Sequence, residues 1–387
     1  MTETATSLEL GHPPPTNRTG SPRLPGLDVT RAVALIGVVV MNYHGYLNGG
    51  DDGIDRSLAE RIFDPTQGPL TTRFASTFVL VAGMGVALLT NRSRQSGDRL
   101  AISDDRWRLA RRGLLLYSFG LLIEWIWNGT ILFYYGALFM AAALLCTLRV
   151  RWLIAIGSLA ALAGAGIAWF RVERLIDGKS TDWLEPRITS PRNLLLRTFV
   201  GYTHPLLPWL AFFCAGIVLG RFLPQLARLR GRLIGAGVVM FVVSYAINFI
   251  GLRAATHSFT VEDDSTRRWR RLLSTAPFDR GLLYTIGTLG SSVVAFCVIS
   301  WCADRFPGNA LTVLLAHAGQ MTLTLYVAHV LVFNAVVHWW HWVTPTGLDT
   351  ALVFSLVFWV GAILLGALWH RFVGMGPLER IYRRFGG

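Results

Sequence analysis

The sequence predicts an all-α polytopic membrane protein with about ten transmembrane helices and with both termini in the cytoplasm. Of its 387 residues, 52% are hydrophobic and 15% are charged, whereas a soluble domain usually has a charged fraction of roughly 25%. Several stretches of about 20 residues carry almost no charge, which is the length needed to cross a hydrocarbon core of roughly 30 Å. Such segments must be helical in a bilayer, because their backbone groups find no water to bind there.

Ten apolar segments are expected to be spans. They are residues 27–47, 70–90, 113–128, 130–148, 152–170, 205–222, 233–252, 281–302, 319–340 and 350–370. The third and fourth segments meet at Asn128 and Gly129, a pair that is typical of turns. These two spans are therefore expected to form a tight hairpin.

The net charge of +13 comes almost entirely from arginine, since Lys179 is the only lysine. The arginines gather at one set of span ends, in the segments 91–112, 149–151, 221–232 and 371–387. Short cytoplasmic loops are enriched in Arg and Lys, so these segments are assigned to the cytoplasm and the loops between them to the outside. Two stretches are expected to be surface helices, 253–280 outside and 308–316 inside.

The chain is expected to consist of a flexible cytoplasmic tail (1–22), a single transmembrane domain (23–375) and a basic cytoplasmic tail (376–387). The four cysteines lie within or beside apolar segments, without the spacing of a disulfide framework or a metal site. The basic stretches that contain aromatic residues flank spans, so nucleic-acid binding is not expected. The halves share no motif, which argues against a transporter built from inverted repeats.

Ionisable side chains inside or beside the spans are the main candidates for a functional site, because each costs roughly 2.5–3.5 kcal/mol on insertion scales. They are Asp28, Arg31, His44, Arg73, Glu124, His204, His329, His338 and His341. Side chains with such a cost are expected either to form a functional site or to form ion pairs and hydrogen bonds that stabilise the fold.

Asp28 and Arg31 are three residues apart and share one face of a helix. One interpretation is a salt-bridged helix start. The other is that Arg31 joins Arg108, Arg111 and Arg112 of the segment RWRLARR to bind a phosphorylated ligand, since a guanidinium donates two parallel hydrogen bonds to a phosphate. The alternative for RWRLARR is that its arginines reflect only the enrichment of arginine in cytoplasmic segments.

Asn42 and His44 close the first span, and Glu124 lies at a similar depth in the third. A histidine at this position is either an interfacial residue or a general base. If Glu124 lies beside His44, its carboxylate fixes the imidazole tautomer and raises its basicity. His329 in the ninth span is a second candidate base, or a buried histidine that a hydroxyl such as that of Tyr326 satisfies.

The segment LDVTRAVALIGVVVMN resembles the opening span of membrane acyltransferases related to heparan-α-glucosaminide N-acetyltransferase, which begins with Leu-Asp-x-x-Arg-Gly and closes with Val-Asn or a His. Five further stretches resemble the bacterial YeiB-like branch of that superfamily: FVLVAGMGVAL, ILFYYGALFMAAALL, PLLPWLAFFCAGIVLGR, GQMTLTLYVAHVLVF and the ending FW…GPLERIYRR. Together these motifs cover nearly the whole chain in order.

The resemblance implies an enzyme that accepts an acyl group, most simply acetyl, from cytoplasmic acyl-CoA and transfers it to a hydroxyl or amine on the other side. By position, Asp28, Arg31 and Asn42 match the first motif, and Tyr326 and His329 match that of the ninth span. Arg31 and RWRLARR would then bind the CoA phosphates. Acyl-CoA would be a co-substrate, and no permanently bound cofactor and no metal are implied.

Two positions depart from the family pattern. Ala32 follows the arginine where the family usually has glycine, which is a mild change on a helix. The better-known acetyltransferases have a catalytic histidine shortly before the second span, where this chain reads FDPTQGPLTTRF. The base must therefore come from elsewhere, and His44 and His329 are the two candidates.

The predicted function is acyl transfer to an envelope glycan, glycolipid or exported molecule, by a multi-pass protein of the bacterial cytoplasmic membrane. His44 is expected to deprotonate the acceptor, Asn42 to stabilise the thioester oxyanion and Glu124 to orient the imidazole. The residues expected to contact the acceptor are Arg73, Tyr326 and His204. The alternatives are a proton-coupled transporter or lipid flippase that uses the same ionisable groups, and a non-catalytic scaffold. A homo-oligomer is compatible with the sequence.

Overall fold

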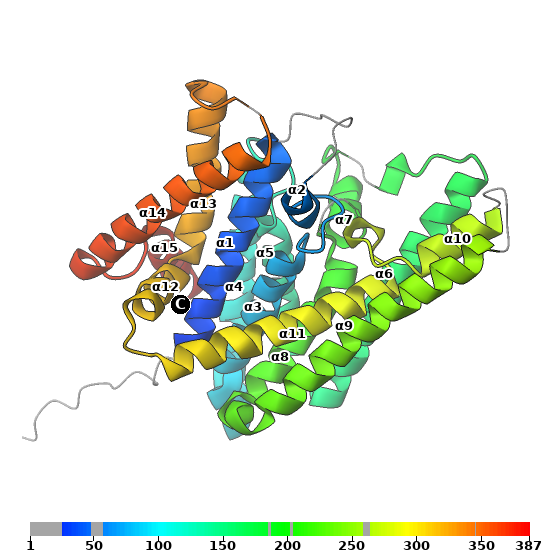
Figure 1. Cartoon of the computed structure of the whole chain (residues 1–387). Helices are drawn as coiled ribbons and strands as arrows, with labels where there is room; N and C mark the ends of the chain where they lie inside the picture. The colour runs from blue at the N-terminus through cyan, green and yellow to red at the C-terminus, as the bar shows by residue number, and fades with distance from the viewer. Residues whose placement is uncertain (1–24, 48–56, 185–186, 202–203, 258–263, 345) are drawn as a thin grey trace, which may run out of the picture.

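The computed structural model describes residues 25–47, 57–184, 187–201, 204–257, 264–344 and 346–387 (Figure 1). The expected tail 1–22 and the acid-rich residues 48–56 lie outside these ranges. Every regular element in the described ranges is a helix, which confirms the all-α class.

Within the described residues, seven helical segments are long and apolar enough to cross a membrane. These segments are formed by α1 (Pro25–Leu47), α3 (Arg73–Ser96), α6 (Val150–Ile176), α9 (Leu226–His257), α11 (Leu282–Arg305), α13 (Thr322–Phe333) continued by the π-helix η4 (Asn334–Trp339), and α14 (Leu348–Phe372). Three apolar helices are shorter: α5 (Leu132–Leu145), α8 (Leu206–Arg221) and α12 (Ala310–Gln320). The chain is thus a multi-pass membrane protein, and the count of ten spans stays a prediction.

The remaining helices are shorter or more polar. They are α2 (Leu58–Ile62), α4 (Arg99–Ile123), α7 (Pro191–Phe199), α10 (Asp264–Leu272) and α15 (Pro377–Gly386), with the 3-10 turns η1 (Asp182–Leu184), η2 (Leu223–Gln225) and η3 (Pro277–Asp279). Helices α10 and α12 occupy the two stretches where surface helices were expected. Residues 377–386 form a helix that packs against α4 and α13.

The prediction of a loop over 91–112 was wrong, because α3 continues to Ser96 and α4 begins at Arg99. Only two residues separate the helices: Gly97, whose φ of 70° ends α3, and Asp98, whose side chain accepts a 3.0 Å hydrogen bond from the backbone of Leu100. Arg, Leu and Ala are strong helix formers. A search for apolar segments finds the parts of the chain that lie in the hydrocarbon core. It does not find the start of a helix whose first half is charged.

The expected hairpin of the third and fourth spans is confirmed by the packing of α4 against α5. The turn contains Gly129 with a φ of 88°, a conformation that favours glycine. Close packing recurs between α3 and α8. A Cβ on Gly216 would lie 2.0 Å from the carbonyl oxygen of Leu80, so only glycine permits this backbone approach.

Helix α1 lies in the middle of the bundle, where it packs against α3, α11, α12 and α14 (Figure 1). Because α13 also contacts α1, side chains near the end of the first helix meet side chains from the last third of the chain. Helix α1 therefore contributes residues to both of the clusters described below.

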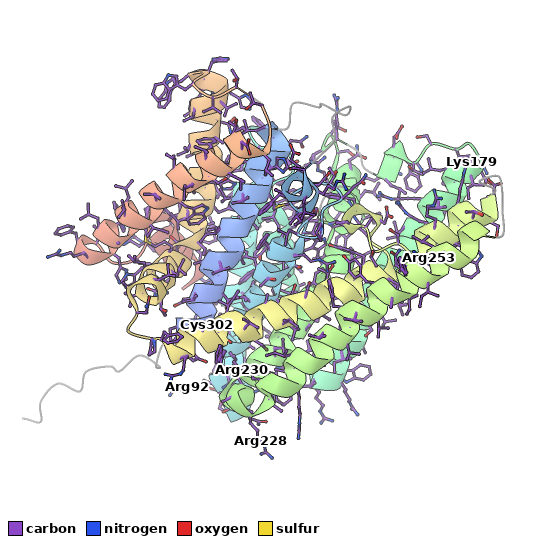
Figure 2. The ribbon with its side chains drawn as sticks, in the orientation of Figure 1. Arg92, Lys179, Arg228, Arg230, Arg253 and Cys302 are labelled. Carbon is purple, nitrogen blue, oxygen red and sulfur yellow. The ribbon has the colours of Figure 1, made fainter. Side chains whose placement is uncertain are left out.

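One end of the bundle carries most of the arginine, and we call it the arginine-rich end. Here the ends of α4 and α5 are joined by Arg106 and Thr147, those of α8 and α5 by Arg221 and the carbonyl of Leu148, and those of α9 and α11 by Arg230 and Asp304. Figure 2 shows Arg92, Arg228 and Arg230 at this end and Lys179 and Arg253 toward the other. The other end, which contains α7, α10 and the last turn of α1, is called the opposite end.

Candidate functional site

Asn42 and His329 form the centre of the candidate site. The side-chain amide nitrogen Nδ2 of Asn42 lies 3.3 Å from Nε2 of His329. His329 on α13 is completely buried, whereas Asn42 on α1 is half-buried. Asn42 is therefore the more accessible member of the pair.

The hydrogen bonds of His329 determine its tautomer. Its Nδ1 lies within hydrogen-bonding distance of the carbonyl oxygen of Tyr326, and a carbonyl can only accept. The proton must therefore be on Nδ1, which leaves the lone pair of Nε2 to accept from the Asn42 amide. An imidazole held in this way presents one defined basic atom.

Aromatic and hydroxyl side chains hold His329 in place. The Tyr43 hydroxyl donates to the backbone carbonyl of His329 at 3.0 Å, and the Trp127 ring lies edge-on to the imidazole with centroids 5.5 Å apart. The Tyr326 hydroxyl lies 3.0 Å from Oγ1 of Thr130 and accepts from the backbone of Ile131 at 3.1 Å. These contacts tie α1, the α4–α5 turn and α13 together around one imidazole.

The segment after His329 is irregular. Helix α13 changes into the π-helix η4 at Asn334, whose side chain donates a 2.9 Å hydrogen bond to the carbonyl of Val330. Insertions of π geometry in helices occur frequently at functional sites. At its other end, α13 begins with Glu379 of α15 accepting from the backbone of Leu323 and Thr324 at 2.7 and 3.0 Å. The helix that carries His329 is thus held at both ends.

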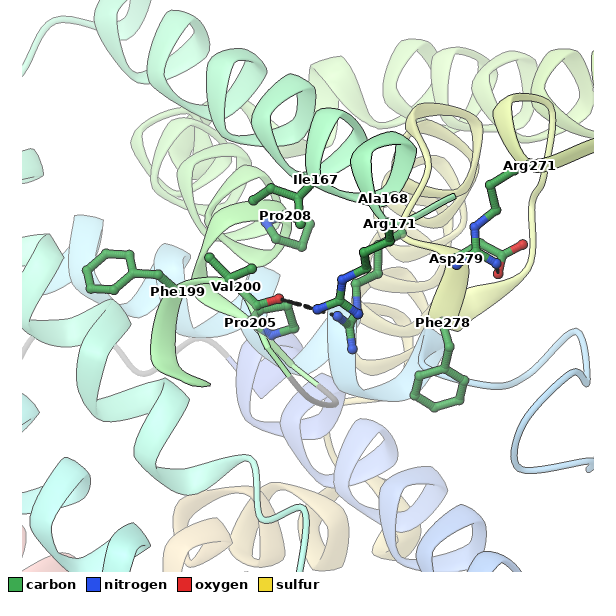
Figure 3. A pocket seen from close by; sticks show the side chains of 12 residues that line it. Ile167, Ala168, Arg171, Phe199, Val200, Pro205, Pro208, Arg271, Phe278 and Asp279 are labelled. Atoms are coloured by element: carbon green, nitrogen blue, oxygen red, sulfur yellow. Dashed lines mark hydrogen bonds and ion pairs between the residues drawn. The ribbon is translucent and has the colours of Figure 1, made fainter. Parts of the chain in front are cut away.

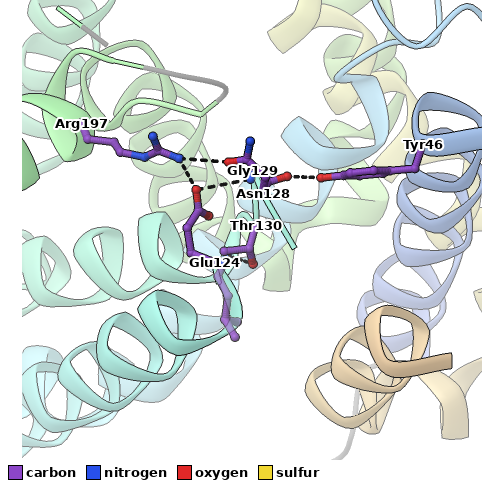
Figure 4. Close-up of polar contacts among 7 residues, drawn as sticks. Tyr46, Glu124, Asn128, Gly129, Thr130 and Arg197 are labelled. Carbon is purple, nitrogen blue, oxygen red and sulfur yellow. Dashed lines mark hydrogen bonds and ion pairs between the residues drawn. The ribbon is translucent and has the colours of Figure 1, made fainter. Parts of the chain in front are cut away.

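The expected pair of Glu124 and His44 is not formed. Glu124 accepts a hydrogen bond from Arg197 on α7, and each side chain of this ion pair is only 9% exposed (Figure 4). Arg197 also reaches Oδ1 of Asn128 at 3.4 Å, and the backbone of Asn128 accepts from Tyr46. Glu124 therefore joins α7 to the α4–α5 turn, and Asn128 of the same turn joins it to α1. A buried carboxylate is costly unless it is paired, which accounts for the ion pair with Arg197.

His44 faces a different part of the molecule. Its Nδ1 lies 2.7 Å from the backbone carbonyl of Phe63, in the segment before α3, and its side chain is buried. One residue of helix separates His44 from Asn42, so the two side chains point in different directions. The structure thus joins Asn42 with His329, and His44 with the segment that follows α2.

A second cluster lies at the arginine-rich end, around the first turns of α1. Arg31 is 3.1 Å from Asp28, and Asp28 also accepts a 3.2 Å hydrogen bond from Gln320. Gly319 allows α12 to lie directly on α1 here, since a Cβ on it would be 1.9 Å from the Asp28 carbonyl oxygen. The expected ion pair of Asp28 and Arg31 is present, and a role of Arg31 in ligand binding stays a prediction.

Part of the RWRLARR segment lies near Arg31. The Arg112 guanidinium lies 5.2 Å from the centre of the Tyr382 ring on α15. Burial raises the pKa of Tyr382 to about 12, although the positive charges of Arg112 and Arg31 act on the same hydroxyl in the opposite direction. Arg31 and Arg112 thus both lie close enough to Tyr382 to act on its hydroxyl. Arg108 pairs with Asp105 at 3.0 Å, and Arg111 lies beside Gly387.

Arg73 is buried and has a separate set of partners. Its guanidinium donates to Thr288 at 2.5 Å, to Tyr245 at 2.9 Å and to Ser291 at 3.3 Å, between α3, α9 and α11. These partners are neutral hydroxyls, and three aromatic rings surround the charge. The arrangement is that of a cation held by hydroxyls and ring faces.

His204 lies at the opposite end, in the segment before α8. Its ring centre is 4.6 Å from that of Trp209 and 6.1 Å from that of Tyr134. Burial and the positive charge of Arg280 lower the pKa of His204 to about 3. Its imidazole is therefore neutral at neutral pH, and it is a weaker base than an exposed histidine.

This lowered pKa predicts a pH dependence of stability. As the pH falls from about 6.5 toward about 3, the unfolded chain binds a proton at His204 that the folded chain excludes. The free energy of unfolding should fall by at most about 1.4 kcal/mol per pH unit in this window. Thermal unfolding of the detergent-purified protein across the window measures the effect. His204→Gln should remove this contribution, and an unchanged pH dependence in the variant would assign it to other groups.

Comparison with known families gives two matches. The family model for the catalytic domain of heparan-alpha-glucosaminide N-acetyltransferase matches residues 23–245, which is more than half of the chain. The chain belongs to the heparan-alpha-glucosaminide N-acetyltransferase family. A second family model, described as a protein of unknown function (DUF418), matches residues 221–386. No curated protein matches the chain.

Membership of the heparan-alpha-glucosaminide N-acetyltransferase family supports an acyltransferase-type enzyme in the membrane. The two matched regions overlap at the start of α9. Asn42 lies in the acetyltransferase region, whereas His329 lies in the region of the second model. The central pair is therefore assembled from both regions of the chain.

Sequence reasoning named Asn42, His329, Tyr326, Arg31 and Arg112, and the structure brings these together in two clusters. It missed Arg197, the partner of Glu124. A signal was present, because Ser190 followed by Pro191 is typical of a helix start. Ser190 does cap α7, accepting a 3.2 Å hydrogen bond from the backbone of Asn193. A buried carboxylate in the third span then required a cation from such a neighbouring helix.

Two further residues of this heparan-alpha-glucosaminide N-acetyltransferase family member were also missed. Trp127 was read only as part of the third apolar segment, although its ring packs edge-on against His329. Glu379 was read as part of a basic tail, although its carboxylate binds the first turn of α13. Neither contact has a local sequence signal, because each partner lies about 55 or more residues away, a separation at which periodicity carries no information.

Proposed function

We propose that this protein transfers an acyl group from acyl-CoA to a hydroxyl or amine of an acceptor, with His329 as the general base. The observation that carries the proposal is the 3.3 Å contact between Nδ2 of Asn42 and Nε2 of His329, in a chain that belongs to an acetyltransferase family. One side chain is a hydrogen-bond donor that can stabilise an oxyanion, and the other is a base with a defined tautomer.

The proposed step exchanges the partner of Nε2. The acceptor hydroxyl or amine replaces the Asn42 amide as the donor to His329, and its proton moves to Nε2 as its oxygen or nitrogen attacks the thioester carbonyl. The Asn42 amide then donates to the developing oxyanion. As the C–S bond breaks, the proton passes from His329 to the departing thiolate, so that CoA leaves as a thiol and the base is restored.

The phosphates of the donor are proposed to lie at the arginine-rich end, between Arg31 and Arg112. Arginine suits this role because its planar fork donates two hydrogen bonds to a phosphate. Arg31 and Asn42 are eleven residues apart on α1, or roughly 16 Å along the helix axis. The donor must therefore separate its phosphates from its thioester by a long arm, as acyl-CoA does.

In this proposal ten helices cross the membrane: α1, α3, α4, α5, α6, α8, α9, α11, α13 with η4, and α14. The arginine-rich end faces the cytoplasm, in keeping with the enrichment of arginine on that side of membranes. The acceptor would then come from the opposite end as an envelope glycan, glycolipid or exported molecule. The membrane would be the bacterial cytoplasmic membrane.

Binding of acetyl-CoA to the detergent-purified protein tests the donor site. Arg31→Ala is expected to raise the Kd for acetyl-CoA by about 10- to 100-fold, the loss of one charge-assisted hydrogen-bonded contact. Slow hydrolysis of acetyl-CoA, with water as the acceptor, gives an activity readout in the same samples. Titration calorimetry measures the affinity.

Arg228→Ala is the matched control, because Arg228 is an exposed arginine of the same end (Figure 2). It should leave the Kd unchanged. Equal weakening by both substitutions would indicate general electrostatic attraction. A folded wild-type protein that neither binds nor hydrolyses acetyl-CoA would contradict the proposed function.

A further inference from the structure

Helix α15, at the arginine-rich end, has an inner side that is held by the protein. Leu378, Tyr382 and Gly386 are spaced four residues apart, so they lie on one side of the helix. Leu378 and Tyr382 pack on the hydrophobic core, and Gly386 lies against the side chain of Arg112 on α4. These contacts fix which residues of α15 face outward.

The outer side of α15 combines arginines with large apolar residues. Ile381 and Phe385 are four residues apart and are 55% and 46% exposed. Arg380 and Arg384, with the same spacing, form a second row beside them and are exposed as well. A helix on which a basic row adjoins an apolar row is typical of helices that lie in the headgroup region of a membrane.

The positive charge of this outer side is not neutralised within the described part of the chain. Neither Arg383 nor Arg384 forms an ion pair with a residue that the structure describes, and Arg380 donates to the neutral backbone carbonyl of Val373. Glu379, the only acidic side chain of α15, points the other way and binds the first turn of α13. The outer side of α15 is therefore purely cationic.

Helix α10 at the opposite end is also short and rich in arginine, but two of its arginines have carboxylate partners. Arg268 pairs with Glu173 of α6 at 2.8 Å, and Arg271 pairs with Asp279. Figure 3 shows Arg271 and Asp279 together at the edge of a small pocket. Carboxylates of the protein thus neutralise arginines of α10, whereas the outer arginines of α15 face an anion from outside the chain.

We propose that the outer side of α15 binds the headgroups of anionic phospholipids in the membrane leaflet at the arginine-rich end. The lipid phosphates accept hydrogen bonds from Arg380, Arg383 and Arg384, while Ile381 and Phe385 enter the layer between the headgroups and the acyl chains. A lipid surface matches both rows, because a soluble anion would leave the apolar row in water. Lipid binding at α15 does not depend on the proposed function.

Lipid bound to α15 also acts on the helix that carries His329. Glu379 accepts from the backbone of Leu323 and Thr324 at 2.7 and 3.0 Å, and it accepts from the Thr324 hydroxyl as well. When α15 is held at the membrane surface, this carboxylate stays in place, and the first turn of α13 opens less often. The lipid composition is thereby linked to the helix of the proposed base.

Hydrogen exchange of the full-length protein in nanodiscs tests lipid binding. With phosphatidylglycerol in place of phosphatidylcholine, exchange of the α15 backbone amides is expected to slow by about 10- to 100-fold, the effect of two or three arginines near an anionic surface. The amides of Leu323 and Thr324 should slow in parallel, and unchanged exchange there would overturn the link to α13. Raising the salt concentration from about 0.1 M to about 1 M should remove most of the difference, since the Debye length falls from about 10 Å to about 3 Å.

Two double variants assign the effect to α15. Arg383→Gln combined with Arg384→Gln should lose most of the protection by phosphatidylglycerol, and it should fold because both arginines are exposed. Arg92→Gln combined with Arg228→Gln is the matched control, since it removes two exposed arginines of the same end outside α15 (Figure 2). It should keep the protection. Equal loss in both double variants would indicate general electrostatic attraction and would overturn the assignment to α15.

Ile381→Ser separates a lipid surface from a soluble anion. It should weaken the protection in phosphatidylglycerol, because serine in place of Ile381 interrupts the apolar row. Unchanged protection in this variant, or equal protection of the wild type by inorganic phosphate in phosphatidylcholine nanodiscs, would overturn the assignment to lipid. Equal exchange of α15 in the two lipids would overturn the proposal as a whole. None of these results measures acetyl-CoA binding or hydrolysis, so failure here is distinct from failure of the proposed function.

Discussion

His329→Gln is expected to lower the rate of acyl transfer by about 10²- to 10⁴-fold, the range that a positioned general base contributes. The affinity for acetyl-CoA should not change, because His329 lies away from the arginine-rich end. Glutamine preserves the approximate size of the side chain and its ability to hydrogen bond with Asn42, so the fold should be retained. Hydrolysis rates at saturating acetyl-CoA, together with the Kd, measure the two effects separately.

His44→Gln is the matched control for this substitution. His44 is bound to the backbone carbonyl of Phe63, so its replacement is expected to cost about 1–2 kcal/mol of stability and to leave the rate unchanged. The reverse pattern, with activity lost in His44→Gln and kept in His329→Gln, would make His44 the base. The contact of Asn42 with His329 would then be purely structural.

Arg197→Gln is expected to destabilise the protein by about 3–5 kcal/mol. Both side chains of the Glu124–Arg197 pair are 9% exposed, and removal of one charge leaves the other buried without compensation. Chemical denaturation of the detergent-purified protein, followed by tryptophan fluorescence, measures the loss. The double variant with Glu124→Gln should recover much of it, since neither buried charge remains.

Arg192→Gln provides the comparison on the same helix, because this arginine is exposed. Its effect should be within about 0.5 kcal/mol, as is usual for surface positions. If Arg197→Gln were no more destabilising than Arg192→Gln, the Glu124–Arg197 pair would contribute little to the fold. Additive effects of Glu124→Gln and Arg197→Gln would lead to the same conclusion.

The all-α class could be predicted from hydropathy, because a bilayer allows few alternatives to a helix for an apolar segment. Individual polar residues could also be selected, because polar groups in such segments are costly. The residues with which these polar side chains interact could not be predicted. Asn42 and His329 were both named, yet hydropathy does not determine which helices are neighbours, and so Glu124 was assigned to His44 instead of Arg197.

The start of α4 illustrates the same limit at the level of one helix. Its first half carries the charged segment RWRLARR, which hydropathy assigns to a loop, whereas helix propensity favours a helix. The two signals report different properties, depth in the membrane and backbone conformation. A prediction that used both would have placed the helix start close to Asp98, whose side chain is a typical N-cap.

The contact between Asn42 and His329 also has a consequence for the order of synthesis. These residues are 287 positions apart. At roughly 5–20 residues per second, the ribosome delivers the second on the order of tens of seconds after the first. Glu379, which binds the first turn of α13, emerges later still. Throughout this interval Asn42 is in the membrane without its imidazole partner. A chain released before His329 is synthesised would therefore lack the residue that we propose as the general base, and it is expected to be inactive in the acetyl-CoA hydrolysis assay.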